Sequence, residues 1–190
     1  MHTGNIAFAA FAAILVSGVA DAAMKPRAVA HMKTQTGAAA GQVDFLQTNH
    51  GVLITYDIKG LRPGVHAIHI HTSGNCDPKV KFTSAGPHFS PQQKMHGFMT
   101  RGGPHAGDLP NEFAASDGTL HAATMTTAFA LGNGKKSIFD RDGAAIVVHA
   151  GADDYSGQPA GNSGDRIACG VIVRTVGPAK RRAAQRTAHK

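Results

Sequence analysis

Six of the seven histidines between positions 69 and 149, together with Asp108, lie at intervals that suit a metal site. The first two histidines are two residues apart within an apolar run, so in a strand both would point to the same face. Imidazole is a ligand of copper and zinc, and one carboxylate among imidazoles is an ordinary zinc ligand. The pattern therefore predicts a two-metal site built from His69, His71, His88, His96, His105, Asp108 and His149.

Any one of these histidines, taken alone, would be interpreted as a surface or hydrogen-bonded residue. Six at these intervals favour metal ligation instead. Five further histidines have no other potential ligand at such spacing, and we interpret them as surface or tail residues: His2, His31, His50, His121 and His189.

The elements that must position this site are predicted to be short strands. Apolar and polar residues alternate over several runs, and no helical spacing is convincing beyond the first segment. We expect strands at residues 42–47, 52–58, 65–71, 120–126, 144–149 and 167–173, with a turn at 49–51. An all-β sandwich or barrel follows.

Two long segments interrupt the strands. Residues 75–118 are rich in Gly and Pro and hold three of the histidines, and residues 151–165 are polar and Gly-rich. Loops of this length are either functional or disordered, and the histidines and cysteines here favour ordered loops.

Cys76 and Cys169 are the only cysteines. In an exported protein such a pair favours a disulfide, worth roughly 4 to 5 kcal/mol in the loop-entropy model; the alternative is two buried free thiols.

The formal charge of +7 is located at the two ends of the chain. Residues 28–177 contain twelve Lys/Arg and eleven Asp/Glu, a net of +1, and 190 residues suit one domain. The basic surplus comes from Lys25, Arg27 and the tail, so the sequence predicts no nucleic-acid binding. The tail, residues 178–190, is predicted to be disordered, and it could contact an anionic surface or remain solvated.

The first 22 residues are predicted to be a signal peptide. Residues 6–19 are apolar and uncharged, and Ala20-Asp21-Ala22 has the small-x-small form of a cleavage site. The apolar run is shorter than the roughly 20 residues of a membrane span, so no membrane span is expected. No Lys or Arg precedes it, which leaves an uncleaved anchor or a misplaced start as alternatives. We expect cleavage near Ala22 and export, most simply to the periplasm.

Roughly residues 28–177 resemble the copper/zinc superoxide dismutases of the exported bacterial type, and five segments in order carry the resemblance. They are residues 64–71 (GVHAIHIH), 84–89 (SAGPHF), 105–111 (HAGDLPN), 148–154 (VHAGADD) and 161–170 (GNSGDRIACG). The resemblance implies a flattened Greek-key β-sandwich or barrel with long metal-binding and active-site loops. It also implies an oxidoreductase that converts superoxide to oxygen and hydrogen peroxide by alternate reduction and oxidation of copper. The family commonly forms homodimers, although the sequence leaves the oligomeric state open.

Carried over residue by residue, the resemblance implies one copper and one zinc in each chain, with His88 bridging the two metals. Copper would be held by His69, His71, His88 and His149, and zinc by His88, His96, His105 and Asp108. Zinc cannot change its oxidation state, so its role would be structural.

Further roles are implied outside the ligand set. Asp153 would hydrogen-bond the free nitrogens of His69 and His96, and Arg166 would dock the superoxide anion beside the copper. The Cys76–Cys169 disulfide would pin the metal loop to the strand that follows Arg166. His66 is out of phase with the neighbouring ligands, and we expect a structural hydrogen-bonding role for it.

The sequence departs from the family pattern at several positions. Ala67 and Ile68 replace Gly-Phe, and Pro87 precedes the bridging histidine where Gly is usual. Asp165 places a negative charge beside Arg166, which is expected to weaken the attraction of an anionic substrate. Residues 155–160 carry no charge, so any charges that steer the substrate must come from elsewhere.

The competing function is a non-catalytic metal-binding or copper-delivery module on the same fold. Relatives of that kind often lack metal ligands or the active-site arginine, and both are present here.

Overall fold

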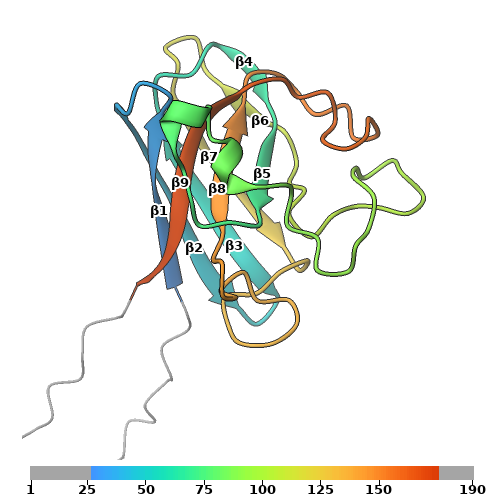
Figure 1. The fold of residues 1–190 in the computed structure, drawn as a ribbon. Coiled ribbons are helices and arrows are strands. Elements are labelled where there is room, and N and C mark those ends of the chain that lie inside the picture. The colour runs from blue at the N-terminus through green and yellow to red at the C-terminus, as the bar shows by residue number, and fades with distance from the viewer. Residues whose placement is uncertain (1–26, 176–190) are drawn as a thin grey trace, which may run out of the picture.

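A computed structural model describes residues 27–175 of this chain, and nearly all of its regular structure is antiparallel β-sheet (Figure 1). The two long loops extend on the same side of the sheet (Figure 1). The strands are β1 (Arg27–Thr34), β2 (Ala39–Thr48), β3 (Gly51–Ile58), β4 (Gly64–His66), β5 (Ile68–His71), β6 (Glu112–Ala114), β7 (Leu120–Thr126), β8 (Ala145–His149) and β9 (Arg166–Thr175). Two single-turn 3-10 helices, Pro78–Val80 and Thr83–Ala85, lie in the first long loop.

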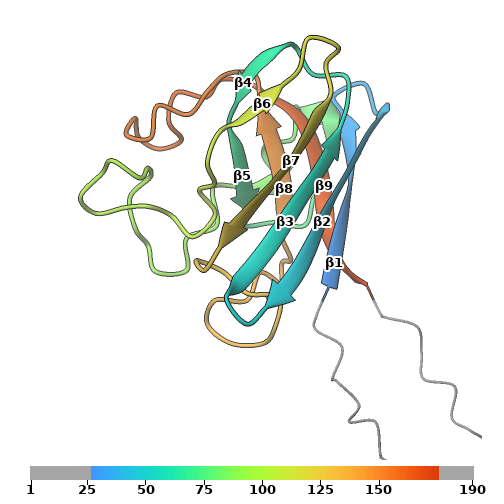
Figure 2. The same ribbon diagram turned by 180° about the vertical axis from the view of Figure 1, so that it is seen from behind.

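Seven strands form one curled sheet in the order β5-β8-β9-β1-β2-β3-β7. Figure 2 shows β1, β2, β3 and β7 as one layer, with β5 and β8 behind it. Arg27 pairs with Thr175, so the two ends of the described chain lie side by side. The predicted all-β class is therefore confirmed.

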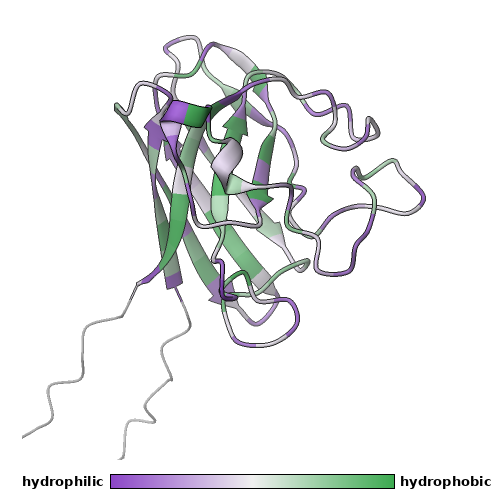
Figure 3. Cartoon of the chain, in the orientation of Figure 1, coloured by the Kyte–Doolittle hydropathy of each residue, from purple (hydrophilic) through white to green (hydrophobic). Residues whose placement is uncertain are grey.

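The core lies between the two layers and follows the alternation seen in the sequence. In β3, Val52, Ile54, Tyr56 and Ile58 are buried, while the residues between them are partly or fully exposed. Figure 3 shows apolar residues concentrated on the strands and polar residues on the loops. This contrast explains why the strands, rather than the loops, could be placed from sequence.

Strand β8 is buried on both faces, which accounts for its uninterrupted apolar sequence. Ile146 and Val148 face the main core. Ala145 and Val147 face a second apolar cluster, which includes Phe82 and Ala85 of the first long loop. The loop therefore covers the outer face of this strand.

The structure corrects the predicted strand at residues 65–71. The chain divides at Ala67 into β4, which pairs with β6 in a small second sheet, and β5, at the edge of the main sheet. The Ala67 amide donates to Gly151 O at 2.8 Å, and its carbonyl accepts from the His149 amide at 2.9 Å. Strands β1 and β6 were not predicted from the sequence.

No helix among residues 27–175 is long and apolar enough to cross a membrane. The predicted signal peptide and the basic tail lie outside the described residues.

Candidate metal centre

Strand β5 points its two histidines away from the core. Ile68 and Ile70 pack in the main core, so the alternation of the strand sends His69 and His71 to its other face. Both histidine side chains are nonetheless fully buried, because the two long loops cover this face.

Two segments of the first long loop run alongside β5 and deliver further ligand types. His88 lies opposite His71, and Asp108 lies opposite His69, each in an isolated β-bridge. The Ile70 amide donates to Gly107 O at 2.8 Å, and Ile70 O accepts from the Phe89 amide at 2.8 Å. A Cβ at position 107 would overlap the Ile70 carbonyl, so only glycine permits this close approach.

His149 reaches the same site from the end of β8. The register between β8 and β9 shifts between Val148 and His149, and His149 lies opposite Arg166. Such an irregularity re-aims a side chain at the end of a strand. The shift therefore places the histidine and the arginine together on the loop side of the sheet.

Four imidazole nitrogens converge without a hydrogen-bond partner among the described residues. The other ring nitrogens face oxygen atoms: His71 Nδ1 lies 2.8 Å from Gly86 O, and His149 Nδ1 lies 3.2 Å from Gly164 O. An oxygen of this kind only accepts, so these nitrogens carry the hydrogen and the opposite lone pairs face the site. The converging atoms are His69 Nδ1, His71 Nε2, His88 Nε2 and His149 Nε2, all within 4.8 Å of one another. A buried set of unpaired lone pairs fits a copper ion.

A second donor set surrounds one carboxylate oxygen. Asp108 Oδ1 lies 2.9 Å from His88 Nδ1, 3.1 Å from His96 Nδ1 and 3.2 Å from His105 Nδ1. Three imidazole nitrogens and one carboxylate fit a four-coordinate zinc. The tightest grouping by distance takes His69 in place of His105. We favour His105, because the free nitrogen of His69 already belongs to the first set.

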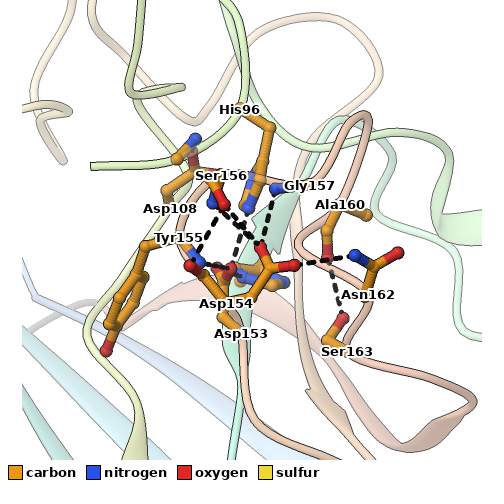
Figure 4. Close-up of polar contacts among 12 residues, drawn as sticks. His96, Asp108, Asp153, Asp154, Tyr155, Ser156, Gly157, Ala160, Asn162 and Ser163 are labelled. Atoms are coloured by element: carbon orange, nitrogen blue, oxygen red, sulfur yellow. Dashed lines mark hydrogen bonds and ion pairs between the residues drawn. The ribbon is translucent and has the colours of Figure 1, made fainter. Parts of the chain in front are cut away.

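Asp153 joins the two donor sets from the second long loop (Figure 4). Its Oδ2 lies 2.9 Å from His69 Nε2, and its Oδ1 lies 2.9 Å from His96 Nε2, with all three side chains fully buried. A carboxylate in this position orients both imidazoles and directs their Nδ1 atoms toward the metals. A Cβ at Gly161 would overlap Asp153 Oδ1, so this glycine leaves room for the contact.

Burial disfavours the charged form of three donor imidazoles, those of His71, His88 and His149. It lowers the pKa of His149 to about 3 and that of His88 to about 4, and it places the pKa of His71 well below the ordinary value. Burial alone would raise the pKa of Asp108. The hydrogen bonds from His88 and the Gly97 amide outweigh it, so the pKa of this carboxyl is lowered. At neutral pH the imidazoles of His71 and His149 are therefore neutral and the carboxyl of Asp108 is ionised, which are the forms that bind metal.

The predicted disulfide between Cys76 and Cys169 is present, with the two Cα atoms 5.7 Å apart. It ties the first long loop to β9, close to Arg166. One guanidinium nitrogen of Arg166, Nη1, donates to Phe82 O at 2.9 Å. The carbonyl that orients the arginine therefore belongs to the loop that the disulfide holds.

An open cleft of about 650 Å³ is lined by His88, which belongs to both donor sets, and by Arg166. Its other ionisable residues are His105 and Asp140, and Pro87, Phe89, Pro91 and Pro159 contribute apolar walls. Arg166 is the only cation among the lining residues. The cleft is therefore suited to a small anion that binds beside His88.

Asp165 does not share this cleft with Arg166. It lines a separate cavity of about 340 Å³ together with Arg62 and His66. Asp140, rather than Asp165, is the acidic residue in the lining of the cleft. The weakening of anion binding by Asp165 stays a prediction. His66 is buried, and its ring nitrogens lie 2.7 Å from His149 O and from Arg62 O. These contacts agree with the structural role expected for it.

Several contributors to the site could not be found from the sequence. The side chain of Asn111 exchanges two hydrogen bonds with the main chain of Asp153: its Oδ1 accepts from the Asp153 amide at 2.8 Å, and its Nδ2 donates to Asp153 O at 2.9 Å. The main-chain amide of Asn111 donates to Tyr155 Oη at 2.8 Å. The side chain of Gln158 accepts from the His96 main-chain amide, and the main-chain oxygen of Phe82 accepts from Arg166. No spacing rule signals such contacts, because they join loops that are distant in the chain.

The histidines that we interpreted as surface or tail residues do not belong to the site. His121 pairs with Asp57 at the surface, and His31 and His50 are exposed. His2 and His189 lie outside the described residues.

Comparison with known proteins identifies the family. The sequence model of the copper/zinc superoxide dismutases matches residues 39–172, which contain every donor described above. The chain belongs to the copper/zinc superoxide dismutase family. Copper and zinc are the metals of this family, and the two donor sets fit them in number and type.

Similar dismutases come from bacteria. The chain is 43% identical to superoxide dismutase [Cu-Zn] 2 of Aquifex aeolicus, over 77% of this chain and 86% of that protein. It is 42% identical to superoxide dismutase [Cu-Zn] of Caulobacter vibrioides, over 76% and 84%. Among solved structures, a SOD-like protein from Bacillus subtilis matches with a TM-score of 0.73 and 37% identity, over 76% of this chain and 97% of that one.

Proposed function

We propose that this protein is an exported superoxide dismutase that converts superoxide to oxygen and hydrogen peroxide. The observation that supports it best is the set of buried, unpaired imidazole nitrogens next to a cleft whose only lining cation is Arg166. The proposed copper ligands are His69, His71, His88 and His149, and the proposed zinc ligands are His88, His96, His105 and Asp108. When bound, copper supplies the one-electron chemistry and zinc stabilises the site.

The protein's own groups bind the substrate and hold the ligands in place. Arg166 offers a guanidinium in the lining of the cleft, where it can pair with an anion. Gly86 O and Gly164 O fix the ring orientation of His71 and His149, and Asp153 does the same for His69 and His96. His88 presents one nitrogen to each donor set, so a single imidazole can serve both metals.

The direct test is activity of the metal-reconstituted mature protein. We expect one copper and one zinc per chain and dismutation of superoxide generated in solution. A fully copper-loaded protein without activity would support the competing function, a non-catalytic copper-binding module. The complete donor set and Arg166 favour the enzyme. A homodimer, the usual state in this family, is part of the proposal and can be measured by sedimentation.

Replacing Arg166 by alanine should lower kcat/KM about 10-fold or more, because a charged group in a cleft raises the association rate of an opposite charge by that order. Copper and zinc contents should be unchanged, since the guanidinium contacts Phe82 O rather than a donor atom. The dependence of kcat/KM on ionic strength should weaken in the same variant. Arg166→Lys serves as the control that keeps the charge, and equal rates in Arg166→Ala and the parent would contradict the docking role.

Export to the periplasm is supported by the disulfide, because such bonds persist in oxidising compartments. We expect the mature protein to begin near Ala23. N-terminal sequencing of protein recovered from the periplasm checks this, and a full-length chain in the membrane fraction would support an uncleaved anchor.

The basic tail has two alternative roles: a solvated extension, which we favour, or a segment that contacts an anionic surface. The dismutase domain has a nearly balanced charge, and the tail that follows it carries Lys180, Arg181, Arg182, Arg186 and Lys190. Salt-dependent binding to anionic lipid vesicles or polysaccharide that is lost when residues 179–190 are deleted would support the second role. Identical binding before and after the deletion would show that the tail is only a solvated extension.

A further inference from the structure

The side-chain amide of Gln158 pairs with the main chain of His96 through both of its polar atoms. The His96 amide donates to Gln158 Oε1 at 3.0 Å, and Gln158 Nε2 donates to His96 O at 2.8 Å. These two bonds reproduce the exchange that a residue makes with its partner in an antiparallel sheet. Gln158 Nε2 also donates to Ser156 O at 3.0 Å, which fixes the side chain against its own loop.

His96 has no strand partner of its own. It lies in the first long loop, is fully buried and is one of the proposed zinc ligands. Its Nε2 lies 2.9 Å from Asp153 Oδ1, and its Nδ1 lies 3.1 Å from Asp108 Oδ1. The second long loop therefore contacts both the main chain of His96, through Gln158, and its Nε2, through Asp153. These contacts leave Nδ1 free to face the zinc position.

The contact between the two loops extends on either side of Gln158. The Met99 amide donates to Tyr155 O at 3.0 Å. Gly97 passes so close to the same carbonyl that a Cβ there would overlap it. Residues 96–99 therefore contact residues 155–158 along one continuous interface, and Gln158 lies at its His96 end.

The loop that carries Gln158 is held rigid by Asp154 (Figure 4). Its Oδ1 accepts from the Ser156 amide at 2.9 Å and from the Gly157 amide at 2.6 Å, and its Oδ2 accepts from Asn162 Nδ2 at 2.7 Å. The glutamine amide is therefore presented from a fixed turn, which reduces the entropy lost when it holds another segment.

We propose that Gln158 is a positioning residue for zinc, which holds the main chain of His96 so that its Nδ1 faces the metal. The inference rests on the proposed zinc site. Loss of outer-shell contacts lowers metal affinity about 10- to 100-fold. Gln158 acts through the backbone of one ligand, so the lower end, about 10-fold, is expected.

The test compares Gln158→Met with the parent. Methionine keeps the length and flexibility of the side chain but cannot make these two hydrogen bonds. Zinc release to a chelator should be about 10-fold faster, and the visible spectrum of cobalt placed at the zinc site should change. Hydrogen exchange at the His96 amide should rise, because its acceptor is gone. Gln92→Met is the matched control, since Gln92 is an exposed glutamine of the same loop as His96 with no side-chain hydrogen bond in residues 27–175.

A second variant separates the two bonds. Gln158→Glu keeps the acceptor for the His96 amide and removes the donor to His96 O, so protection of that amide from exchange should be retained. Unchanged zinc release and unchanged His96 exchange in Gln158→Met would overturn the proposal. If the parent itself bound no zinc, the proposed site would fail instead, so the two failures are distinguishable.

Discussion

The His149→Ala variant should lose copper, and its dismutase activity should fall more than about 100-fold. This loss is larger than the roughly 10- to 100-fold loss expected when a residue that only hydrogen-bonds a ligand is replaced. The substitution removes one of four converging lone pairs and opens space in a buried site. The remaining three imidazoles retain copper less tightly. Zinc should stay bound, because every nitrogen around Asp108 Oδ1 is untouched. Metal analysis together with the rate of superoxide consumption measures both effects.

The control for this substitution is His121→Ala. His121 is an exposed histidine on β7 whose Nδ1 pairs with Asp57 at 3.3 Å, and it contacts no proposed ligand. Its replacement should change neither metal content nor rate. If His149→Ala kept a full copper and the parental rate, His149 would not be a ligand and the copper half of the site would have to be reassigned.

Removing the disulfide should lower the free energy of unfolding by about 2 to 5 kcal/mol. The Cys76→Ala, Cys169→Ala double variant releases the loop that covers the outer face of β8. Phe82 and Ala85 in that loop pack on Ala145 and Val147, so the second apolar cluster also loosens. Denaturant unfolding of the variant and the parent, with metals removed from both, measures the difference.

The same variant should also lose catalytic efficiency. Phe82 O, which accepts from Arg166 at 2.9 Å, is carried by the loop that Cys76 anchors. A mobile carbonyl no longer fixes the guanidinium, so kcat/KM should fall toward the value of Arg166→Ala while copper content is kept. Reduction of the parent disulfide should reproduce both changes. A reduced protein with parental stability and rate would show that the bond is dispensable for the folded site.

Some of the loop geometry could be anticipated from residue types, and some could not. The first long loop was expected to carry zinc ligands, and His88, His96 and His105 do meet at Asp108 Oδ1. Which ring nitrogen each histidine offers depends on Gly86 O, Gly164 O and Asp153, none of which can be placed by spacing. Neighbouring positions also diverge: Asp165 and Arg166 are adjacent in the chain yet line different cavities.

The sequence by itself determined the donor types, the alternating strands and the pair of cysteines. Strand alternation is a local property, so the two-residue spacing is enough to assign His69 and His71 to one face. Only the tertiary structure decided where the chain divides at Ala67, how a register shift aims His149, and how Gln158 holds His96. These features depend on hydrogen bonds between segments far apart in sequence, and loops without a repeating pattern carry no local signal of their partners.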